Sequence, residues 1–136
     1  MKLALYVLLI VSCIASCKKT IEKAQEAAAI DAITSGYWIV TKFQKGSTEI
    51  TDSFSGYKFQ FKENHTVDAL KSNVIEMSGH WEADVSSRTI DANFTNASSP
   101  LTFLNGRWLI TNSTWTSVDA TLTIDGEKRE LHLKKE

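Results

Sequence analysis

Residues 117–135 read SVDATLTIDGEKRELHLKK, and this stretch decides the fold. Apolar residues occupy alternate positions on both sides of Asp125-Gly126: Val118, Ala120, Leu122 and Ile124 before it, Leu131 and Leu133 after it. Strict alternation indicates strands with one buried and one wet face, which is typical of antiparallel sheets. Asp-Gly between two such runs predicts a tight hairpin, because that turn needs positive φ angles.

The same period of two begins at Gly36 and continues to the end of the chain. Phe59 and Phe61, for example, alternate with polar residues, and Glu63-Asn64 offers a turn directly after them. We expect strands over residues 37–45, 54–62, 66–71, 75–83, 88–94, 107–115, 117–125 and 128–135. Short strands with polar turns between them predict an all-β sandwich or barrel.

Residues 99–106 do not alternate. Pro100 near the start and Gly106 at the end predict a single short helical turn there. We expect Leu101, Phe103 and Leu104 to face inward as a plug.

Residues 18–35, KKTIEKAQEAAAIDAITS, are rich in good helix formers and contain no Pro or Gly. We expect a helix from about Thr20 to Ile33. Two interpretations remain open. The helix is either a tether that makes no contact beyond spacing, or a lid over one end of the globular part.

The first seventeen residues have the plan of a bacterial export signal. Met1-Lys2 supplies a positive start, residues 3–11 are apolar, and Ile14-Ala15-Ser16-Cys17 follows. Such a pattern describes a secretory signal peptide. The apolar run is shorter than the roughly 20 residues that a membrane-spanning helix needs. The last four residues resemble the lipobox of bacterial lipoproteins. That resemblance implies that residues 1–16 are removed and that Cys17 is lipidated.

The composition limits the fold classes and partners that are compatible with the mature chain. Removing residues 1–16 leaves 120 residues, enough for one domain, with 14 basic and 16 acidic side chains. A near-neutral balance without a basic cluster argues against nucleic acid as a partner. Because Cys13 leaves with the signal peptide and Cys17 carries the lipid, the domain has no disulfide. Its stability must come from core burial, and four Trp and six Phe are available for that.

Gly-x-Trp occurs three times, ending at Trp38, Trp81 and Trp108. Gly allows close backbone approach, and the Trp two residues later faces the same side, toward the core. A Gly-x-Trp at the first strand resembles the signature of lipocalins and fatty-acid-binding proteins. The whole plan resembles the small lipocalin-like lipoproteins of Bacteroidetes. That resemblance implies an antiparallel, up-and-down, eight-stranded barrel over residues 36–136, after a lipidated Cys and helical tether over 17–35.

Motifs for catalysis or metal binding are not evident in the sequence. His65, His80 and His132 lack partners at metal-ligand spacing, and no HExxH, Cys pair or calcium loop occurs. No Ser lies in GxSxG, and the carboxylate pairs fall on expected outer faces and turns. We therefore expect no enzyme activity, no catalytic or metal-binding residues and no cofactor.

Two classes of function remain. The first is binding of a small apolar or amphipathic molecule at an open barrel end, for which Tyr57, Phe59, Trp81 and Trp108 are the candidate lining residues. The second is a structural or interaction lipoprotein with a filled core, acting through surfaces such as the Lys58/Lys62 face or residues 111–116. An enzyme inhibitor that presents its loops is a third possibility. The protein partner and the ligand are not identified by the sequence.

The lipoprotein resemblance also implies a location. Enterobacterial lipoproteins with Asp after the Cys stay at the inner membrane, whereas Lys18 stands there in this chain. Surface display in Bacteroidetes tends to follow an acidic stretch, which Lys18-Lys19-Thr20 lacks. We therefore expect a lipid anchor on Cys17 in the outer membrane, facing the periplasm.

Overall fold

The computed structural model describes residues 21–136, so the predicted signal peptide and Cys17 lie outside the described residues. A helix covers residues 21–34, close to the expected 20–33. The strands are β1 (Trp38–Lys45), β2 (Thr48–Glu49), β3 (Tyr57–Phe61), β4 (Thr66–Lys71), β5 (Val74–Asp84), β6 (Thr89–Asn93), β7 (Gly106–Ser113), β8 (Ser117–Ile124) and β9 (Glu127–Lys135). Two 3₁₀ helices, η1 (Thr51–Phe54) and η2 (Leu101–Leu104), lie between them.

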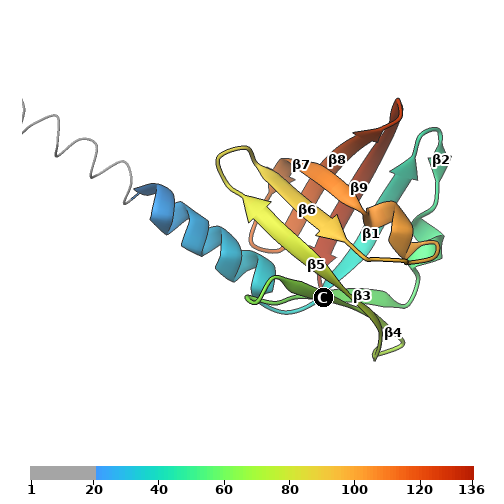
Figure 1. The fold of residues 1–136 in the computed structure, drawn as a ribbon, viewed down its shortest axis with the longest axis horizontal. Helices are drawn as coiled ribbons and strands as arrows, with labels where there is room; N and C mark the ends of the chain where they lie inside the picture. Colours follow the sequence, from blue (N-terminus) through green and yellow to red (C-terminus); the bar gives the residue numbers. More distant parts are fainter. Residues whose placement is uncertain (1–20) are drawn as a thin grey trace, which may run out of the picture.

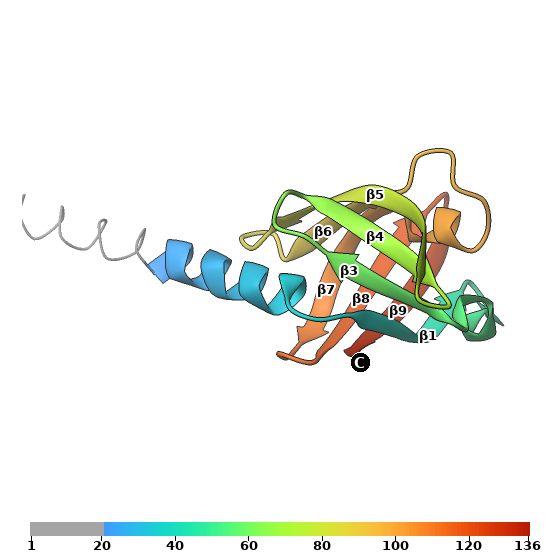
Figure 2. The ribbon, with the colours of Figure 1, turned by 90° about the horizontal axis from the view of Figure 1, so that it is seen from below.

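Eight strands close into a barrel (Figures 1 and 2). Each strand from β3 to β9 pairs antiparallel with its neighbour in the chain, and β1 pairs with both β3 and β9. The short β2 pairs only with the end of β1 and stays outside the ring. The prediction of an antiparallel, up-and-down, eight-stranded barrel is confirmed.

The β8–β9 hairpin has the turn that its sequence predicts. Asp125 and Gly126 take φ angles of 50° and 78°, and Ile124 pairs with Glu127 across them. The β3–β4 turn differs from the expectation of a two-residue Glu63-Asn64 turn. The main-chain N–H of Lys62 bonds to the carbonyl of Thr66, so three residues form the loop, and His65 takes the positive φ of 66°.

The strand expected over residues 54–62 begins at Tyr57, because η1 occupies its first part. The Thr51 hydroxyl accepts a hydrogen bond from the N–H of Phe43 at 2.9 Å, and the ring of Phe54 stacks on Phe43. Strands β1 and β3 pair only at Trp38 and Phe59. The η1 segment therefore packs where the ring has its weakest pairing.

The barrel interior is packed with apolar side chains from alternate strand positions. Its fully buried members include Trp38, Phe43, Val67, Trp81 and Phe94. The helical turn expected in residues 99–106 is present as η2, and it buries Leu101 and Leu104. Phe103 is only half-buried and lies beneath the cations of Lys45 and Arg129.

Up-and-down connections place the turns alternately at two ends. The helix lies at the same end as the turns 62–65, 85–88 and 114–116 (Figure 2). Segments 46–56, 72–73, 94–105 and 125–126 form the other end, where η1 and η2 pack. We call the first of these the helix end.

Candidate binding site at the helix end

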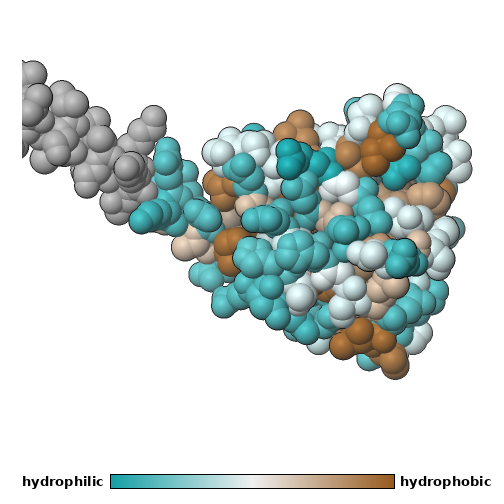
Figure 3. All heavy atoms as spheres, in the orientation of Figure 1, coloured by the Kyte–Doolittle hydropathy of each residue, from teal (hydrophilic) through white to brown (hydrophobic). Residues whose placement is uncertain are grey.

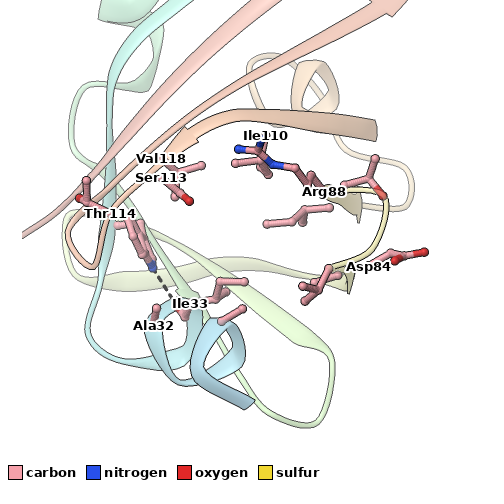
Figure 4. Close-up of a pocket in the computed structure, with 14 residues that line it drawn as sticks. Ala32, Ile33, Asp84, Arg88, Ile110, Ser113, Thr114 and Val118 are labelled. Carbon is pink, nitrogen blue, oxygen red and sulfur yellow. Dashed lines mark hydrogen bonds between the residues drawn. The ribbon is translucent and has the colours of Figure 1, made fainter. Parts of the chain in front are cut away.

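A cavity of about 210 Å³ lies between the helix and the open helix end of the barrel (Figure 4). The helix contributes Ala29, Ala32 and Ile33 to its lining. Barrel side chains that line it include Trp38, Ile90, Ile110 and Val118. We call this space the mouth cavity, and its lining is mainly apolar.

The last turns of the helix form the cover of the mouth cavity. Ile30 and Ile33 pack against the core, and the indole N–H of Trp38 donates to the carbonyl of Ile33 at 2.9 Å. That carbonyl is in the last helical turn, where main-chain acceptors lack partners within the helix. Residues 29–34 of the helix therefore form a lid over the barrel end. The preceding residues 21–28 are exposed and project away from the barrel (Figure 1).

Arg88 lies in the β5–β6 turn, one residue before the start of β6, and takes a φ of 57°. Its side chain is exposed but lines the mouth cavity, whereas Ile90 and Ala92 of β6 line the barrel interior. The N–H of Ile110 donates to the carbonyl of Arg88 at 2.8 Å, which keeps the two residues side by side. In Figure 4 the Arg88 side chain extends across the opening toward Ile110.

Asp84 also borders the mouth cavity but belongs to the outer face, where it pairs with Thr89. Its carboxylate points away from the cavity in Figure 4. It accepts hydrogen bonds from the Ser86 hydroxyl at 2.6 Å and the Ser87 N–H at 3.2 Å. These bonds, that of Ser86 first, hold the pKa of Asp84 below its usual value. Asp84 therefore caps the β5–β6 turn.

A second, smaller cavity of about 60 Å³ lies inside the barrel. It shares Ile90, Ile110 and Val118 with the mouth cavity, so the two spaces lie back to back along the barrel axis. An engineered apolar cavity of about 150 Å³ binds benzene, and the inner space has less than half of that volume, so it alone is too small for such a ring.

The four lining residues predicted from the sequence are all buried. Phe59 and Trp108 line the inner cavity. Tyr57 and Trp81 line neither cavity. Tyr57 donates its hydroxyl to Glu76, and burial, followed by that carboxylate, raises the pKa of Tyr57 to about 12.

Trp81 has partners of its own within the wall. Its ring packs edge-on against Phe61 at 5.5 Å between centroids, and its N–H bonds to the Lys62 carbonyl at 3.0 Å. Tyr57 and Trp81 therefore pack behind the lining of the inner cavity, on Phe59 and Phe61, and do not face either cavity themselves.

Sequence reasoning missed the residues at the mouth: Ala29, Ala32, Ile33, Arg88, Ile110 and Val118. The signal was present in part. Ala29, Ala32 and Ile33 have the i, i+3, i+4 spacing of one helix face, whereas alternation does not place Arg88, because its φ of 57° interrupts the extended backbone. The sequence does not show where on the barrel the helix docks.

The histidines of the described residues do not belong to a cluster that could hold a metal ion. The rings of His65 and His80 are 6.2 Å apart, but within residues 21–136 no cluster of three His, Cys, Asp or Glu could hold a metal ion. His132 lies between Glu130 and Asp119 on the outer face. Among the described residues, no helix combines the length and the apolar character that crossing a membrane requires.

Comparisons with known proteins bear on the fold. No protein-family profile matches the sequence, and no curated protein matches it. The chain is similar to the crystal structure of a DUF4847 family protein from Bacteroides vulgatus ATCC 8482, with a TM-score of 0.57 and 18% sequence identity. The match covers 79% of this chain and 97% of that chain. At this identity the likeness supports the barrel, and the lipocalin-like lipoprotein type stays a prediction.

Proposed function

We propose that this chain is a non-catalytic envelope protein that binds one small apolar or amphipathic molecule in the mouth cavity. The observation that carries the proposal is the apolar space of about 210 Å³ beneath residues 29–34. It exceeds the roughly 150 Å³ that admits benzene in an engineered core, and it falls below the roughly 300 Å³ at which drug-sized pockets begin. The ligand is therefore small.

The proposed protein is attached to the outer membrane through a lipid on Cys17 and faces the periplasm. Support comes from the lipobox-like ending at residues 14–17 and from the helix, which leads from that segment to the barrel. No nucleic acid or cofactor takes part in this proposal.

The binding test uses nitrobenzene, a neutral single-ring quencher of Trp emission that is small enough for the mouth cavity, titrated into the purified chain while Trp emission is recorded. Trp38 lines the mouth cavity, so its emission should be quenched by bound probe. Burying roughly 300 Å² of apolar surface contributes about 7 kcal/mol before association costs, so we expect affinity no tighter than micromolar.

A matched pair of variants locates the bound probe. Ala32→Phe should fill the mouth cavity and abolish saturable binding, because Ala32 lines it. Ala27→Phe, on the exposed part of the same helix, should leave binding unchanged. Absence of saturable binding to the wild-type chain, or equal binding to both variants, would reject the mouth cavity as the site.

A second candidate is an interaction protein with a filled core. The small inner cavity and the hydrophobic tip of the β4–β5 turn favour it, since Val74 is 68% and Ile75 is 55% exposed. Figure 3 shows hydrophobic atoms gathered at that tip, on a face that is otherwise mainly hydrophilic. If the probe does not bind, this candidate remains, and a Val74→Ser/Ile75→Ser double variant should then reduce capture of its partner.

A further inference from the structure

We infer that Asn105 is a site of slow spontaneous deamidation, which the folded barrel holds back and which the opening of one loop releases. This inference is independent of the proposed function. Asn105 is the only asparagine of the sequence that is followed by glycine. Because Gly106 has no side chain, its main-chain nitrogen can approach the amide of Asn105 with little steric resistance. Both residues border an open surface groove, so water reaches them.

The reaction needs no partner other than water. The main-chain nitrogen of Gly106 attacks Cγ of Asn105 and forms a new C–N bond, while the bond from Cγ to Nδ2 breaks. Ammonia leaves with the proton of the Gly106 nitrogen. Water then opens the cyclic succinimide at either carbonyl, which gives aspartate or isoaspartate. In the balance one water is consumed, one ammonium ion is released, and a neutral amide becomes a carboxylate that is ionised at neutral pH.

The fold restrains both reacting groups. Oδ1 of Asn105 accepts from the Phe94 N–H at 2.6 Å, and Nδ2 donates to the Phe94 carbonyl at 3.1 Å. Gly106 in turn pairs with Ala92 in the β6–β7 ladder. Turning Cγ toward the Gly106 nitrogen therefore breaks two hydrogen bonds beside the buried Phe94, which opposes the reaction. Deamidation is consequently confined to moments at which residues 94–105, which we call the plug loop, have opened.

Deamidation should weaken the plug loop permanently. A carboxylate at position 105 can still accept from the Phe94 N–H, but it has no proton to donate to the Phe94 carbonyl, and it repels that oxygen. The carbonyl then keeps the longer bond from the Ala97 N–H, at 3.3 Å. The same loop carries η2, whose Leu101 and Leu104 are buried at this end of the barrel. The modification therefore loosens the end opposite the helix.

The first experiment follows Asn105 in the wild-type full chain, folded and in concentrated guanidinium chloride, at the same mildly alkaline pH. Peptide mapping by chromatography and mass spectrometry measures conversion to aspartate and isoaspartate. We expect conversion to be at least about tenfold slower in the folded chain, because two hydrogen bonds must break first. Hydrogen exchange of the Phe94 amide reports the same opening, so low denaturant concentrations that speed this exchange should speed deamidation in proportion.

The second experiment uses Asn105→Asp as the deamidated product and Asn93→Asp as its matched control. Asn93 is exposed, and its amide bonds to the Thr95 hydroxyl at 3.5 Å. The control therefore adds the same charge next to Phe94 without removing a bond to the Phe94 main chain. We expect Asn105→Asp to speed hydrogen exchange of the plug-loop amides about tenfold, whereas Asn93→Asp should keep the protection of wild type.

Equal conversion in the folded and denatured chains, or no conversion in the denatured chain, would overturn the inference that Asn105 is a protected deamidation site. Equal plug-loop protection in Asn105→Asp and Asn93→Asp would overturn its structural consequence. The conversion experiment uses wild-type protein, so it decides the first point even if Asn105→Asp does not fold.

Discussion

Each tryptophan of the three Gly-x-Trp motifs donates its indole N–H to a main-chain carbonyl outside the strand ladders. The donor–acceptor distances are 2.9, 3.0 and 2.8 Å for Trp38, Trp81 and Trp108. The acceptors are the carbonyls of Ile33, Lys62 and Leu104. Such carbonyls must find a partner when buried, so each ring both fills the core and holds a connecting segment in place.

Replacement of Trp108 should therefore lower the stability of the barrel through two effects, which two variants separate. Trp108→Phe removes the partner of the Leu104 carbonyl, and we expect a loss of about 1–3 kcal/mol in the free energy of unfolding. Trp108→Ala also opens a cavity, and the loss should reach about 3–5 kcal/mol. Urea denaturation measures both. Trp115→Ala is the control, because Trp115 is 62% exposed and should change stability by less than about 0.5 kcal/mol.

Asp68 should give the barrel a dependence on pH. Its carboxylate is almost fully buried on the outer face of β4, bonded to the Lys62 ammonium and the Ser78 hydroxyl, each at 2.6 Å. These bonds, that of Lys62 first, hold the pKa of Asp68 below its ordinary value. An acid with a depressed folded pKa stabilises above the unfolded pKa of about 3.9 and loses that contribution as the pH falls through the folded pKa.

We expect Asp68→Asn to lower the free energy of unfolding at pH 7 by about 1–2 kcal/mol, a modest loss because Lys62 is partly exposed to solvent. The same variant should lose less stability than wild type as the pH falls below 7, so the acid limb of its stability profile should be flatter. Urea titrations from pH 7 to pH 3 provide the measurement. Lys62→Met should flatten the same limb. An acid limb as steep in Asp68→Asn as in wild type would show that other carboxylates dominate it.

At the scale of elements, the sequence predicts strands where the stabilising forces are local. The alternation in residues 117–135 and the Asp125-Gly126 turn are both properties of neighbouring residues, and the β8–β9 hairpin follows from them. The start of β3 could not be predicted in the same way. Phe54 leaves the strand because Thr51 and Phe43 come together, and that contact joins two separate segments.

Docking of the helix is also a property of separate segments. Its Ala-rich sequence predicts a helix, but the choice between tether and lid depends on Ile33 meeting Trp38 at the barrel end. The candidate site lies at this junction, and none of the four lining residues predicted from the sequence lies in it. Phe59 and Trp108, predicted from one strand period, line the inner cavity instead.

Gly79 in β5 and Gly126 in the β8–β9 turn should respond differently to replacement by Ala. A Cβ at Gly79 would lie 2.6 Å from the Asn93 carbonyl oxygen, so β5 and β6 must separate. A Cβ at Gly126 meets nothing within 4 Å, and only the φ of 78° opposes it. We expect Gly126→Ala to cost about 1–2 kcal/mol and Gly79→Ala to cost at least as much.

Hydrogen exchange distinguishes a clash between β5 and β6 from backbone strain in the β8–β9 turn. Gly79→Ala should speed exchange of the amides that join β5 and β6, while Gly126→Ala should affect the β8–β9 turn alone. If Gly79→Ala preserved β5–β6 protection, the close backbone approach at that position would not be essential to the sheet.

For the whole molecule, the attachment to the membrane is the first property to test. Replacing Cys17 by Ala should abolish incorporation of a fatty-acid probe and leave the precursor uncleaved, because the Cys of a lipobox carries the lipid. Cys13→Ala is the matched control and should be labelled like wild type, since Cys13 belongs to the segment that is removed. Labelling of Cys17→Ala would disprove the assignment.

The lid and the proposed attachment share one chain, and this has a mechanical consequence. Residues 35–37 are the only covalent link between the helix and β1 within the described chain. A pull on the chain before residue 21 would therefore load the contacts of residues 29–34 before it loaded the barrel ladders. Those contacts consist of a few apolar side chains and one indole hydrogen bond, whereas the barrel is held by eight strand pairings. Tension would unseat the helix first, so a barrel under load would open its mouth while its fold stayed intact.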